Sequence, residues 1–409
     1  MKITNLSLAA IAVVGMMSVA SADVDMKIGG QAVVYYQTAE SGGDTDFFDK
    51  GNSKANAGLQ LNANSDIGNG FGLGLQGTAL STWGLEKNLV TGVMQSGLGN
   101  NGDTANSSDY FAITKAYLTK KLGNTTLKMG RQELPKSLSP LAFSEGWNVY
   151  KNTFDAVVAI NSDIPDTTVV GAYVSRSNQH GNLNTFDDLH AKTSLDLDGD
   201  GKKGDSVGVE KGAYMLTVAN KSLKQAPITL SYYHMGLGAV GTADAVWADV
   251  QVDAGIPVKF GLQGGMIMPD IGNMDDTQAA GVKVNGKAGP VALQLAYSKV
   301  GGAPIALKNV GTGVKTPLYT QMILNQNHIS RSADTVVLKG VMPVGPGKVI
   351  AQYGATTDNQ KDGSDYNELD VIYKFKALGT TMLAAYVMAD HDEAKDPTNI
   401  IRVWTRYNF

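Results

Sequence analysis

Strand-like runs of alternating apolar and polar residues recur along almost the whole chain, and this pattern limits the possible folds more than any other feature. In residues 56–64 one face is formed by Ala57, Leu59, Leu61 and Ala63, and the other by polar residues and glycine. Because successive side chains of a strand point to opposite faces, each run has an apolar side and a polar side. Short turn sequences such as IGNG, LGNT and IPDT join the runs in pairs, as in antiparallel hairpins. The pattern predicts an all-β protein.

The connections between the runs are alternately short and long. We count eighteen strands, with the first near residues 26–38 and the last at the C-terminus, separated by eight short turns and nine longer loops. An even number of antiparallel strands, with both termini on the short-turn side, is typical of transmembrane barrels. We therefore predict a transmembrane antiparallel β-barrel of 18 strands. Sixteen strands is the alternative, because strand ends predicted from sequence are uncertain by about two to four residues.

The N-terminus has the features of a secretory signal peptide. Lys2 precedes an apolar run from Leu6 to Val19, and the small residues at 20–22 fit a signal-peptidase site. The apolar run is shorter than the roughly 20 residues that cross a bilayer as a helix. We predict that residues 1–22 are removed and that 23–409 form one barrel domain. The chain has no cysteine, which excludes a lipid-modified cysteine and any disulfide framework.

The last ten residues, IIRVWTRYNF, have one apolar face and one face that carries two arginines. The apolar face is formed by Ile401, Val403, Thr405, Tyr407 and Phe409, and the other by Arg402, Trp404, Arg406 and Asn408. Such a strand suits a barrel with lipid outside and water inside. The ending resembles the C-terminal strand of bacterial outer-membrane β-barrels, whose terminal aromatic residues are recognised by the barrel-assembly machinery. The resemblance implies that Tyr407 and Phe409 form an assembly signal.

The composition narrows the class of protein. The formal net charge of -4 favours neither a nucleic-acid partner nor attachment through a basic surface. The mean hydropathy of -0.11 is ordinary, and no apolar stretch after residue 22 approaches the length of a spanning helix. Barrel strands need only about 9 to 11 alternating residues, so these values are compatible with a membrane barrel.

The same alternation predicts which charged residues face water inside the barrel. In one run, Val246, Ala248, Val250 and Val252 alternate with Trp247, Asp249, Gln251 and Asp253. A register slip of one residue would move such charges into lipid, at roughly 2 to 4 kcal/mol for a Lys or Arg at mid-depth. The predicted pore-wall charges are Asp249, Asp253, Lys283, Lys287, Glu368, Asp370, Lys374, Arg402 and Arg406. Both signs are present, and the mild acidic excess of the chain predicts a weak preference for cations.

One loop carries the most specific resemblance. The segment MGRQELPKSLSPLAFSEGWNVYKN, from Met129 to Asn152, is predicted to be the third long loop. It resembles the corresponding region of the OprD-like porins, including the major outer-membrane porins of Campylobacter. The resemblance implies that residues 134–152 fold into the barrel and narrow it. The expected constriction residues are Arg131, Glu133, Lys136, Glu145 and Lys151. An ordinary surface loop with solvated charges is the alternative.

The fourth long loop contains a candidate metal site in the sequence DLDGDGKKGD. Asp196, Asp198 and Asp200 at alternate positions, followed by Gly201, match the start of an EF-hand calcium loop, and the carbonyl of Lys202 takes the next ligand position. Val207 stands where a bidentate Glu is expected, so Asp205 or Glu210 has to replace it. A Ca²⁺ site and a solvated acidic loop are both open.

These features predict an outer-membrane porin of a Gram-negative bacterium that lets ions and small hydrophilic solutes diffuse passively through a water-filled pore. A substrate-specific OprD-like channel is the alternative, and a barrel enzyme or an adhesin fits less well. We expect no enzymatic activity, because the five histidines lack metal-ligand spacing and Asp249 and Asp253 lie about 13 Å apart on a strand, too far for a catalytic carboxylate pair.

The expected partners follow from the same resemblance. They are the outer-membrane lipid with its lipopolysaccharide, the barrel-assembly machinery and further copies of the chain. The Campylobacter porins imply a homotrimer, in which the long loop from Gly84 to Ser108 would contact the next subunit. Other OprD-like members imply a monomer, which is the alternative.

Overall fold

The barrel was analysed in a computed structural model. It describes residues 26–409 except 44, 98–108, 179–182, 184–185, 194–204, 361–362 and 393. In this part of the chain no helix is long and apolar enough to cross a membrane. The helical segments among these residues are the short 3₁₀ turns η1 (Lys50–Asn52), η2 (Leu85–Lys87) and η4 (Asn325–Asn327).

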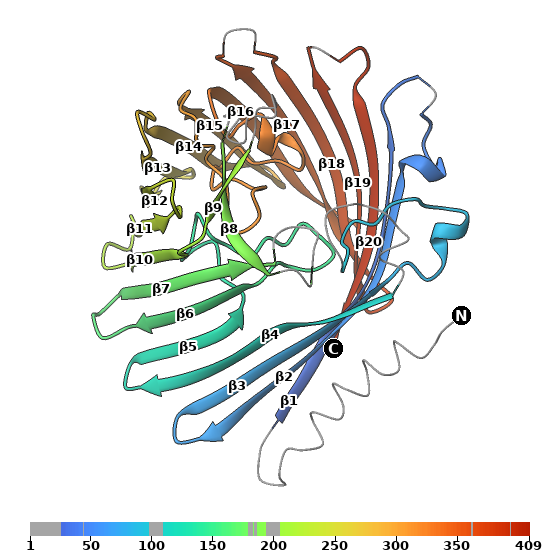
Figure 1. The fold of residues 1–409 in the computed structure, drawn as a ribbon. Helices are drawn as coiled ribbons and strands as arrows, with labels where there is room; N and C mark the ends of the chain where they lie inside the picture. Colours follow the sequence, from blue (N-terminus) through green and yellow to red (C-terminus); the bar gives the residue numbers. More distant parts are fainter. Residues whose placement is uncertain are drawn as a thin grey trace.

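Eighteen strands form one closed antiparallel sheet (Figure 1). They are β1 (Met26–Glu40), β2 (Ser53–Gly68), β3 (Phe71–Ser81), β4 (Asp109–Leu122), β5 (Thr125–Gln132), β6 (Phe154–Asn161), β7 (Thr167–Ser177), β10 (Ala213–Asn220), β11 (Ile228–Gly236), β12 (Thr242–Asp253), β13 (Lys259–Asp270), β14 (Thr277–Ala288), β15 (Val291–Val300), β16 (Ala333–Val344), β17 (Gly347–Asp358), β18 (Tyr366–Ala377), β19 (Thr380–His391) and β20 (Thr398–Asn408). Two further strands, β8 (Asp187–Lys192) and β9 (Ser206–Val209), form a small hairpin in the loop between β7 and β10.

The first and last strands close the barrel. β20 pairs with β1 in an antiparallel register that sets Trp404 opposite Tyr35, and β7 pairs directly with β10. A closed sheet has no free edge with unpaired backbone groups, which is the condition for crossing lipid with strands. The prediction of eighteen strands is confirmed, and the alternative of sixteen is excluded.

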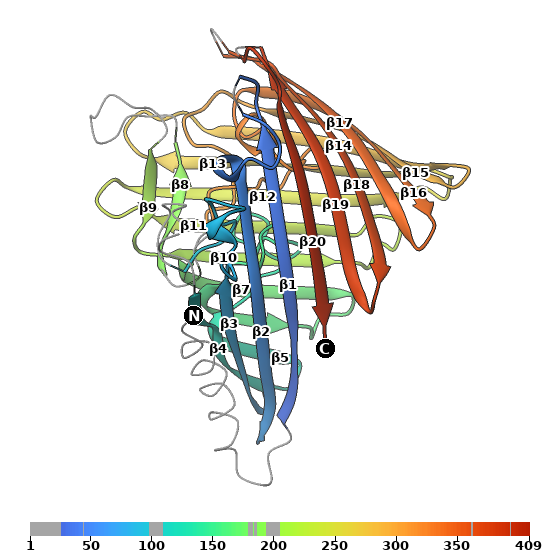
Figure 2. The same cartoon turned by 90° about the vertical axis from the view of Figure 1, so that its right-hand side faces the viewer.

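The predicted alternation of connections is also confirmed. The eight short turns lie at 69–70, 123–124, 162–166, 221–227, 254–258, 289–290, 345–346 and 378–379. The nine loops on the other side differ greatly in length, from 237–241 and 271–276 to 133–153 and 301–332. Figure 2 shows the β8–β9 hairpin on the left, away from the turns at the lower right. The long loops, which can narrow the pore, therefore all start from the same end of the barrel.

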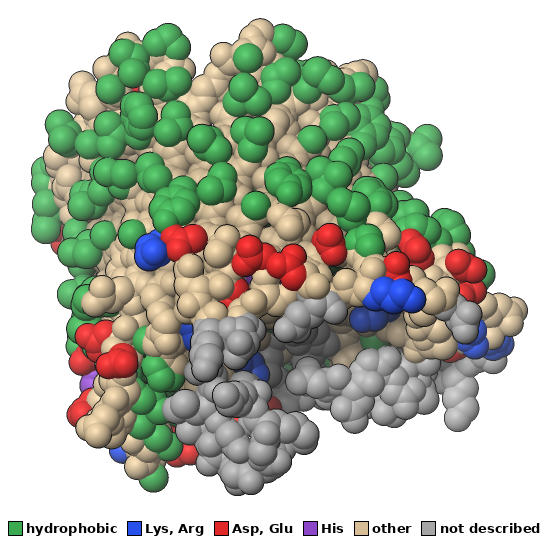
Figure 3. Space-filling view, turned by 90° about the horizontal axis from the view of Figure 1, so that it is seen from above, with side chains coloured by type: hydrophobic (Ala, Val, Ile, Leu, Met, Phe, Trp, Pro, Cys, Tyr) green, Lys and Arg blue, Asp and Glu red, His purple; other side chains and the backbone are tan. Residues whose placement is uncertain are grey.

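The outer wall shows the alternation expected of a lipid-facing surface. In β16, Val336 and Leu338 are 46% and 54% exposed, whereas Val337 between them is 2% exposed. Figure 3 shows one side of the barrel, where hydrophobic side chains cover a broad area and the charged groups gather in a band next to the loops. An apolar band bounded by a charged rim is typical of membrane barrels.

Tyrosines mark the upper border of this apolar band. Tyr353 donates a hydrogen bond to Asn367 at 3.0 Å, and Tyr386 donates one to Asn399 at 2.6 Å. In each pair the acceptor lies on the next strand, two residues further towards the long-loop end than the residue directly opposite the tyrosine. Tyr232 with Asp244 and Tyr297 with Asp334 repeat this diagonal arrangement. Aromatic girdles of this kind sit at membrane interfaces.

The C-terminal strand has the faces that the sequence predicts. Tyr407 and Phe409 are exposed on the outside with ring centroids 5.8 Å apart, and Phe409 exchanges two backbone hydrogen bonds with Gly30, of 2.8 and 3.1 Å. Arg402 is buried on the inner side, where its Nε donates to Gln37 at 3.1 Å. The role of Tyr407 and Phe409 as an assembly signal stays a prediction.

Candidate functional site

Loop 133–153 lies inside the barrel and contacts well-separated parts of its wall. The hydroxyl of Tyr150 donates to the carbonyl of Gln31 in β1 at 3.4 Å. Further along the loop, the backbone N–H of Leu141 donates to the hydroxyl of Tyr233 in β11 at 3.2 Å. Since β1 and β11 are separated by several strands on either side, the loop spans the interior (Figure 1).

A second loop, 301–332, also lies inside the ring of strands, where Figure 1 shows it in orange. The hydroxyl of Tyr319 donates to Asp249 of β12 at 2.6 Å, and the backbone N–H of Leu324 donates to Glu368 of β18 at 2.8 Å. Two carboxylates of the pore wall thus hold this loop, with hydrogen bonds to charged acceptors that are stronger than bonds between neutral groups.

Apolar packing explains why both loops leave the solvent. Many of their buried residues belong to one apolar cluster with the inner faces of β6 to β13, and the members of this cluster from the two loops are Leu134, Leu141, Ala142, Ile305, Leu307, Val310, Leu318 and Ile329. Burial of an apolar side chain of this size contributes roughly 1.5 to 3 kcal/mol. The cluster therefore fixes the loops against the wall, and the remaining lumen is bounded by their polar residues.

Glu145 joins the two loops. It is 4% exposed and accepts hydrogen bonds from Asn309 Nδ2 at 2.7 Å, from Thr312 Oγ1 at 2.5 Å and from the backbone N–H of Lys315 at 3.0 Å. Within its own loop it also accepts from the indole N–H of Trp147 at 2.5 Å. A buried carboxylate is costly unless it is paired and hydrogen-bonded, and here four donors surround it.

Each of the two loops also places one lysine near Glu145. Lys315 donates to the carbonyls of Met322 and Ile323 at 2.8 and 2.7 Å, and Lys136 donates to the carbonyl of Thr316 at 3.0 Å. Burial lowers the pKa of each lysine to about 8, while the negative charge of Glu145 acts in the opposite direction. Loss of solvation disfavours the charged form of a lysine, which explains the lowered pKa.

The predicted constriction residues are divided between different positions. Met129 to Gln132 belong to β5, so the loop begins at residue 133, later than expected. Arg131 lies on the same strand face as the exposed Met129, opposite Asp155, with which it forms an ion pair of 3.0 Å. It is thus placed on the outer side of the sheet and not beside the loops. The predicted loop began at Met129 and so included the last residues of β5, where the alternation of strand faces places Arg131 on the outside.

The other predicted constriction residues lie at the base of loop 133–153 or within it. Glu133 forms ion pairs with Lys115 at 2.5 Å and with Lys151 at 3.0 Å. The charges of both lysines lower its pKa, against the effect of burial. Lys136 and Glu145 lie between the loops as described above. Their effect on permeation stays a prediction.

The acidic residues among the predicted wall charges all have hydrogen-bond or ion-pair partners. Glu368 and Asp370 are 1% and 0% exposed, and Gln352 donates to Asp370 at 2.5 Å. Asp249 accepts from Tyr319, as described, and from Gln251 at 2.5 Å. Asp253 forms an ion pair with Lys259 at 2.7 Å.

The basic wall residues range from the exposed Lys287 and Lys374 to the buried Arg402. Lys283 lies over the ring of Tyr319, 4.0 Å from its centroid. Lys287 and Lys374 are exposed. Arg406 donates to the carbonyl of Val149 in loop 133–153 at 2.9 Å, and Arg402 is buried against Gln37.

Most of the candidate calcium site lies outside the described residues. This holds for Asp196, Asp198, Asp200 and Lys202. Asp205 is described, and its carbonyl accepts a hydrogen bond from the backbone N–H of Thr193 at 2.9 Å. Among the described residues, no group of three or more His, Asp and Glu side chains is arranged to hold a metal ion. Calcium binding stays a prediction for the acidic loop.

Loop 301–332 was not among the segments predicted from the sequence to form the site. Its signal is a long segment without strand alternation that nevertheless contains Ile305, Leu307, Val310 and Leu318. An exposed loop of this length rarely carries so many apolar residues, so this composition indicates a buried loop.

The loop that begins at residue 82 also turns back onto its own chain. The side chain of Asn56 accepts from the backbone N–H groups of Met94 and Gln95 at 2.8 and 3.0 Å, and Gln95 donates to the carbonyl of Tyr150 at 3.0 Å. The described part of this loop therefore supports loop 133–153 from the wall. The structure describes this loop as far as Gly97, and its contact with a neighbouring subunit stays a prediction.

The barrel is similar to solved structures of bacterial channels. OccK8 (OprE) of Pseudomonas aeruginosa aligns with a TM-score of 0.72 at 14% identity, covering 94% of this chain and 98% of that chain. OccAB3 of Acinetobacter baumannii gives 0.73 at 14% identity, covering 94% and 99%. Pseudomonas aeruginosa OpdK, solved with vanillate, gives 0.73 at 14% identity, covering 94% and 98%. These similarities establish the shared fold.

The sequence itself supplies the family. No curated protein matches the chain. A sequence profile described as Gram-negative porin matches residues 7–396, which is nearly the entire chain. The chain therefore belongs to the Gram-negative porin family and is an outer-membrane porin, which confirms the resemblance inferred from loop 133–153 and the C-terminal strand.

Proposed function

We propose that this porin is a passive diffusion pore with a preference for small anions, narrowed by loops 133–153 and 301–332. The observation that supports this most directly is the pair of docked loops, which Glu145 holds together inside the barrel. A barrel of eighteen strands is wide enough for an aqueous path. Loops fixed across it restrict that path to small hydrophilic solutes.

The preference for anions rests on which charges contact water. The acids Asp249, Glu368 and Asp370 accept hydrogen bonds from the wall or from loop 301–332. By contrast, Lys348 and Lys374 lie opposite each other on β17 and β18 and are both exposed. Accessible charges of one sign along a pore favour ions of the other sign. The position of the charges thus supports the opposite preference from the net charge of the chain.

Planar-bilayer recordings test this proposal. Purified protein is expected to give stepwise channel openings. In a KCl gradient, the reversal potential is expected to have the sign of the chloride equilibrium potential. Replacing Arg402 and Arg406 by Gln should shift the reversal potential towards that of potassium. Lys299→Gln is the matched control, because Lys299 lies on the outer wall and pairs with Asp334 at 3.1 Å. Folded protein without conductance would refute the pore, and a potassium-side potential would refute the preference.

A substrate-specific channel is the second candidate. It is favoured by the basic side chains that meet the second loop, namely Lys136 and Lys283, whose charges influence each other. It is also favoured by the fold shared with OpdK, which was solved with vanillate. If the pore is specific, vanillate should reduce the KCl current at concentrations where acetate does not. Equal effects of both anions would support the general pore.

Export and assembly are part of the same proposal. Residues 1–22 act as a signal peptide, Phe409 serves the assembly machinery, and the folded chain forms a homotrimer in contact with lipopolysaccharide. Mass spectrometry of the mature protein tests cleavage before Asp23. A trimer that resists SDS should run as a large species until it is boiled, and a monomer-sized band without heating would refute it. Ca²⁺ in the acidic loop would raise the temperature of this transition, and EDTA would lower it.

A further inference from the structure

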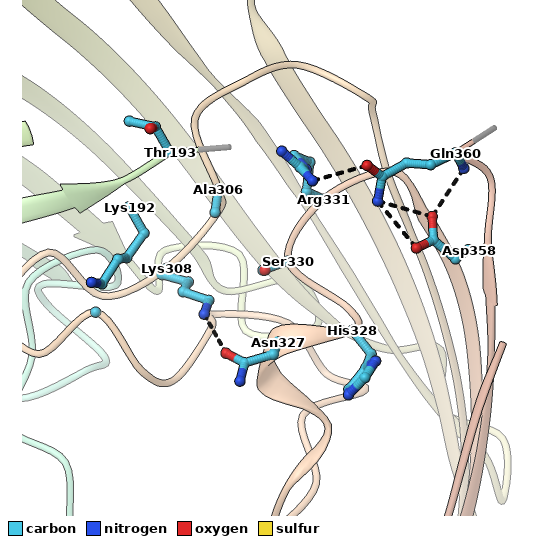
Figure 4. A pocket seen from close by; sticks show the side chains of 11 residues that line it. Lys192, Thr193, Ala306, Lys308, Asn327, His328, Ser330, Arg331, Asp358 and Gln360 are labelled. Carbon is cyan, nitrogen blue, oxygen red and sulfur yellow. Dashed lines mark hydrogen bonds between the residues drawn. The ribbon is translucent and has the colours of Figure 1, made fainter. Parts of the chain in front are cut away.

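A cavity of about 520 Å³ lies at the long-loop end of the barrel. Three separate parts of the chain line it: the end of β8 with Lys192, loop 301–332 with Lys308 and Arg331, and the end of β17 with Asp358 (Figure 4). Its size is within the range of about 300 to 1,000 Å³ that is usual for small-molecule sites. None of the predicted wall or constriction residues lines it.

The basic side chains of this cavity have neutral partners. Lys308 Nζ donates to Asn327 Oδ1 at 2.6 Å, and Arg331 Nη2 donates to Gln360 Oε1 at 2.9 Å. Among the residues that the structure describes, neither of them nor Lys192 forms an ion pair. Amide groups therefore orient Lys308 and Arg331, and no carboxylate among the described residues is in direct contact with either side chain.

Among the lining residues that the structure describes, Asp358 is the one carboxylate, and it already accepts hydrogen bonds. It accepts from the backbone N–H of Gln360 at 2.9 Å and from Gln360 Nε2 at 3.1 Å. The same Gln360 side chain presents its oxygen to Arg331. The amide thus lies between the acid and the guanidinium and fixes the orientation of Arg331. Figure 4 shows this chain of contacts at one side of the cavity, with Lys192 and Lys308 on the other side.

The cavity is electropositive at neutral pH. Burial lowers the pKa of Lys308 to about 8, and the charge of Lys192 acts in the same direction, against Glu145. A pKa of about 8 leaves Lys308 mostly protonated at neutral pH. Burial and the neighbouring His391 lower the pKa of His328 to about 4, so His328 is neutral there. Three positive charges therefore face one negative charge, in a chain whose formal net charge is -4.

From this arrangement we propose that the cavity binds phosphate-type oxyanions, namely inorganic phosphate and small phosphomonoesters, before they reach the constriction. Lys192 approaches from the end of β8, and Lys308 and Arg331 approach from two separate parts of loop 301–332, which suits a tetrahedral group with oxygens in several directions. A carboxylate is planar, carries one charge and needs donors on one side. The fork of an arginine and the point charges of lysines are the usual partners of phosphate oxygens.

Calorimetric titration of the folded full-length protein with inorganic phosphate tests the site directly. Arg331→Gln and Lys308→Gln should each weaken binding about tenfold, the change expected when one charge-assisted hydrogen bond is lost. Arg331→Lys should restore part of the affinity, and Lys299→Gln on the outer wall should leave it unchanged. Glucose 6-phosphate should compete with phosphate. Equal affinity in wild type and both Gln variants, or equal binding of acetate, would overturn the proposal.

Bilayer recordings separate this site from the channel on which it rests. Phosphate added to the long-loop side should reduce the chloride current of the wild type, and the Arg331→Gln variant should need about tenfold more phosphate for the same effect. A conducting channel that phosphate leaves unchanged would overturn the phosphate site and leave the pore intact. Phosphate binding by calorimetry in a protein that never conducts would support the site and overturn the proposed pore.

Discussion

The two loops inside the barrel are held in different ways. Loop 133–153 is fixed to opposite parts of the wall by neutral hydrogen bonds, through Gln31 and Tyr233, and also by Arg406 and by an ion pair with Lys115 at its base. Loop 301–332 is fixed by carboxylates, namely Asp249 and Glu368 of the wall and Glu145 of the other loop. Neutral anchors do not titrate, whereas Lys315 of the second loop does, because burial lowers its pKa to about 8. The first loop is therefore docked in the barrel independently of the second. The docking of the second loop depends on its contact with the first and on ionisation.

Glu145→Ala should have the largest effect, because it removes the acceptor that connects the loops. Asn309, Thr312 and the N–H of Lys315 would lose their partner, and breaking such a buried charged contact costs about 3 kcal/mol. We expect loop 301–332 to undock, to be cleaved faster by added protease and to leave a wider, noisier channel. Loop 133–153 should keep its wall anchors and resist the protease.

Glu133→Ala is the matched control for this comparison. Glu133 lies in the same loop, but it is partly exposed and its ion pairs with Lys115 and Lys151 are accessible to water. Ion pairs of this kind contribute about 1 kcal/mol or less. Its replacement should leave both loops protected. Equal cleavage of loop 301–332 in the two variants would show that Glu145 does not connect the loops.

Raising the pH should have the next largest effect, again on the loop that depends on charge. In the folded protein Lys315 has a pKa of about 8, below its ordinary value, because it is buried. Between pH 8 and about 10.5 the unfolded loop binds more protons than the docked loop, so docking becomes more stable as the pH rises through this window. Below pH 8 the full cost of burying the charged amine is present.

The same titration should alter selectivity. Lys136 and Lys308 also have pKa values lowered to about 8 by burial. Loss of these positive charges should reduce the chloride preference with a midpoint near pH 8. Reversal potentials in a KCl gradient at pH 7 and pH 9.5 measure this change. A preference that stays constant across this range would mean that solvent-exposed lysines such as Lys374 determine it.

The fold could be predicted from the sequence because its determinants are local. Alternation within each run and turn residues between runs are properties of neighbouring residues, and both appear in Asn56–Asn64 and the IGNG turn that follows. Closure then followed from counting strands. Arg131 was assigned wrongly to the loop for a local reason as well, since β5 continues to Gln132 and its face continues with it.

The site could be predicted only in part because its contacts are distant in sequence. Glu145 was among the expected residues, but its partners Asn309 and Lys315 lie more than 160 positions away. The sequence of neither segment indicates that the two segments are in contact. The hydrogen bonds from loop 301–332 to Asp249 and Glu368 could not be predicted from strand alternation, which gives the face of a side chain and not what contacts it. The net charge of the chain likewise does not show which charged side chains contact water, and the ion preference stays a prediction.

Two adjacent tyrosines give the smallest and most closely matched test. Tyr233 faces inward and accepts the N–H of Leu141, whereas Tyr232 faces outward and donates to Asp244 at the membrane rim. Tyr233→Phe removes the acceptor of a buried N–H, which costs about 1 to 2 kcal/mol, and should loosen loop 133–153. Tyr232→Phe loses an exposed bond and should cost less than about 0.5 kcal/mol. Protease cleavage near Leu141 reports the difference, and because the anchor is neutral the effect of Tyr233→Phe should be the same at pH 7 and pH 9.5. If that effect changed with pH, the first loop would depend on ionisation as the second does, and the distinction between the two loops would fail.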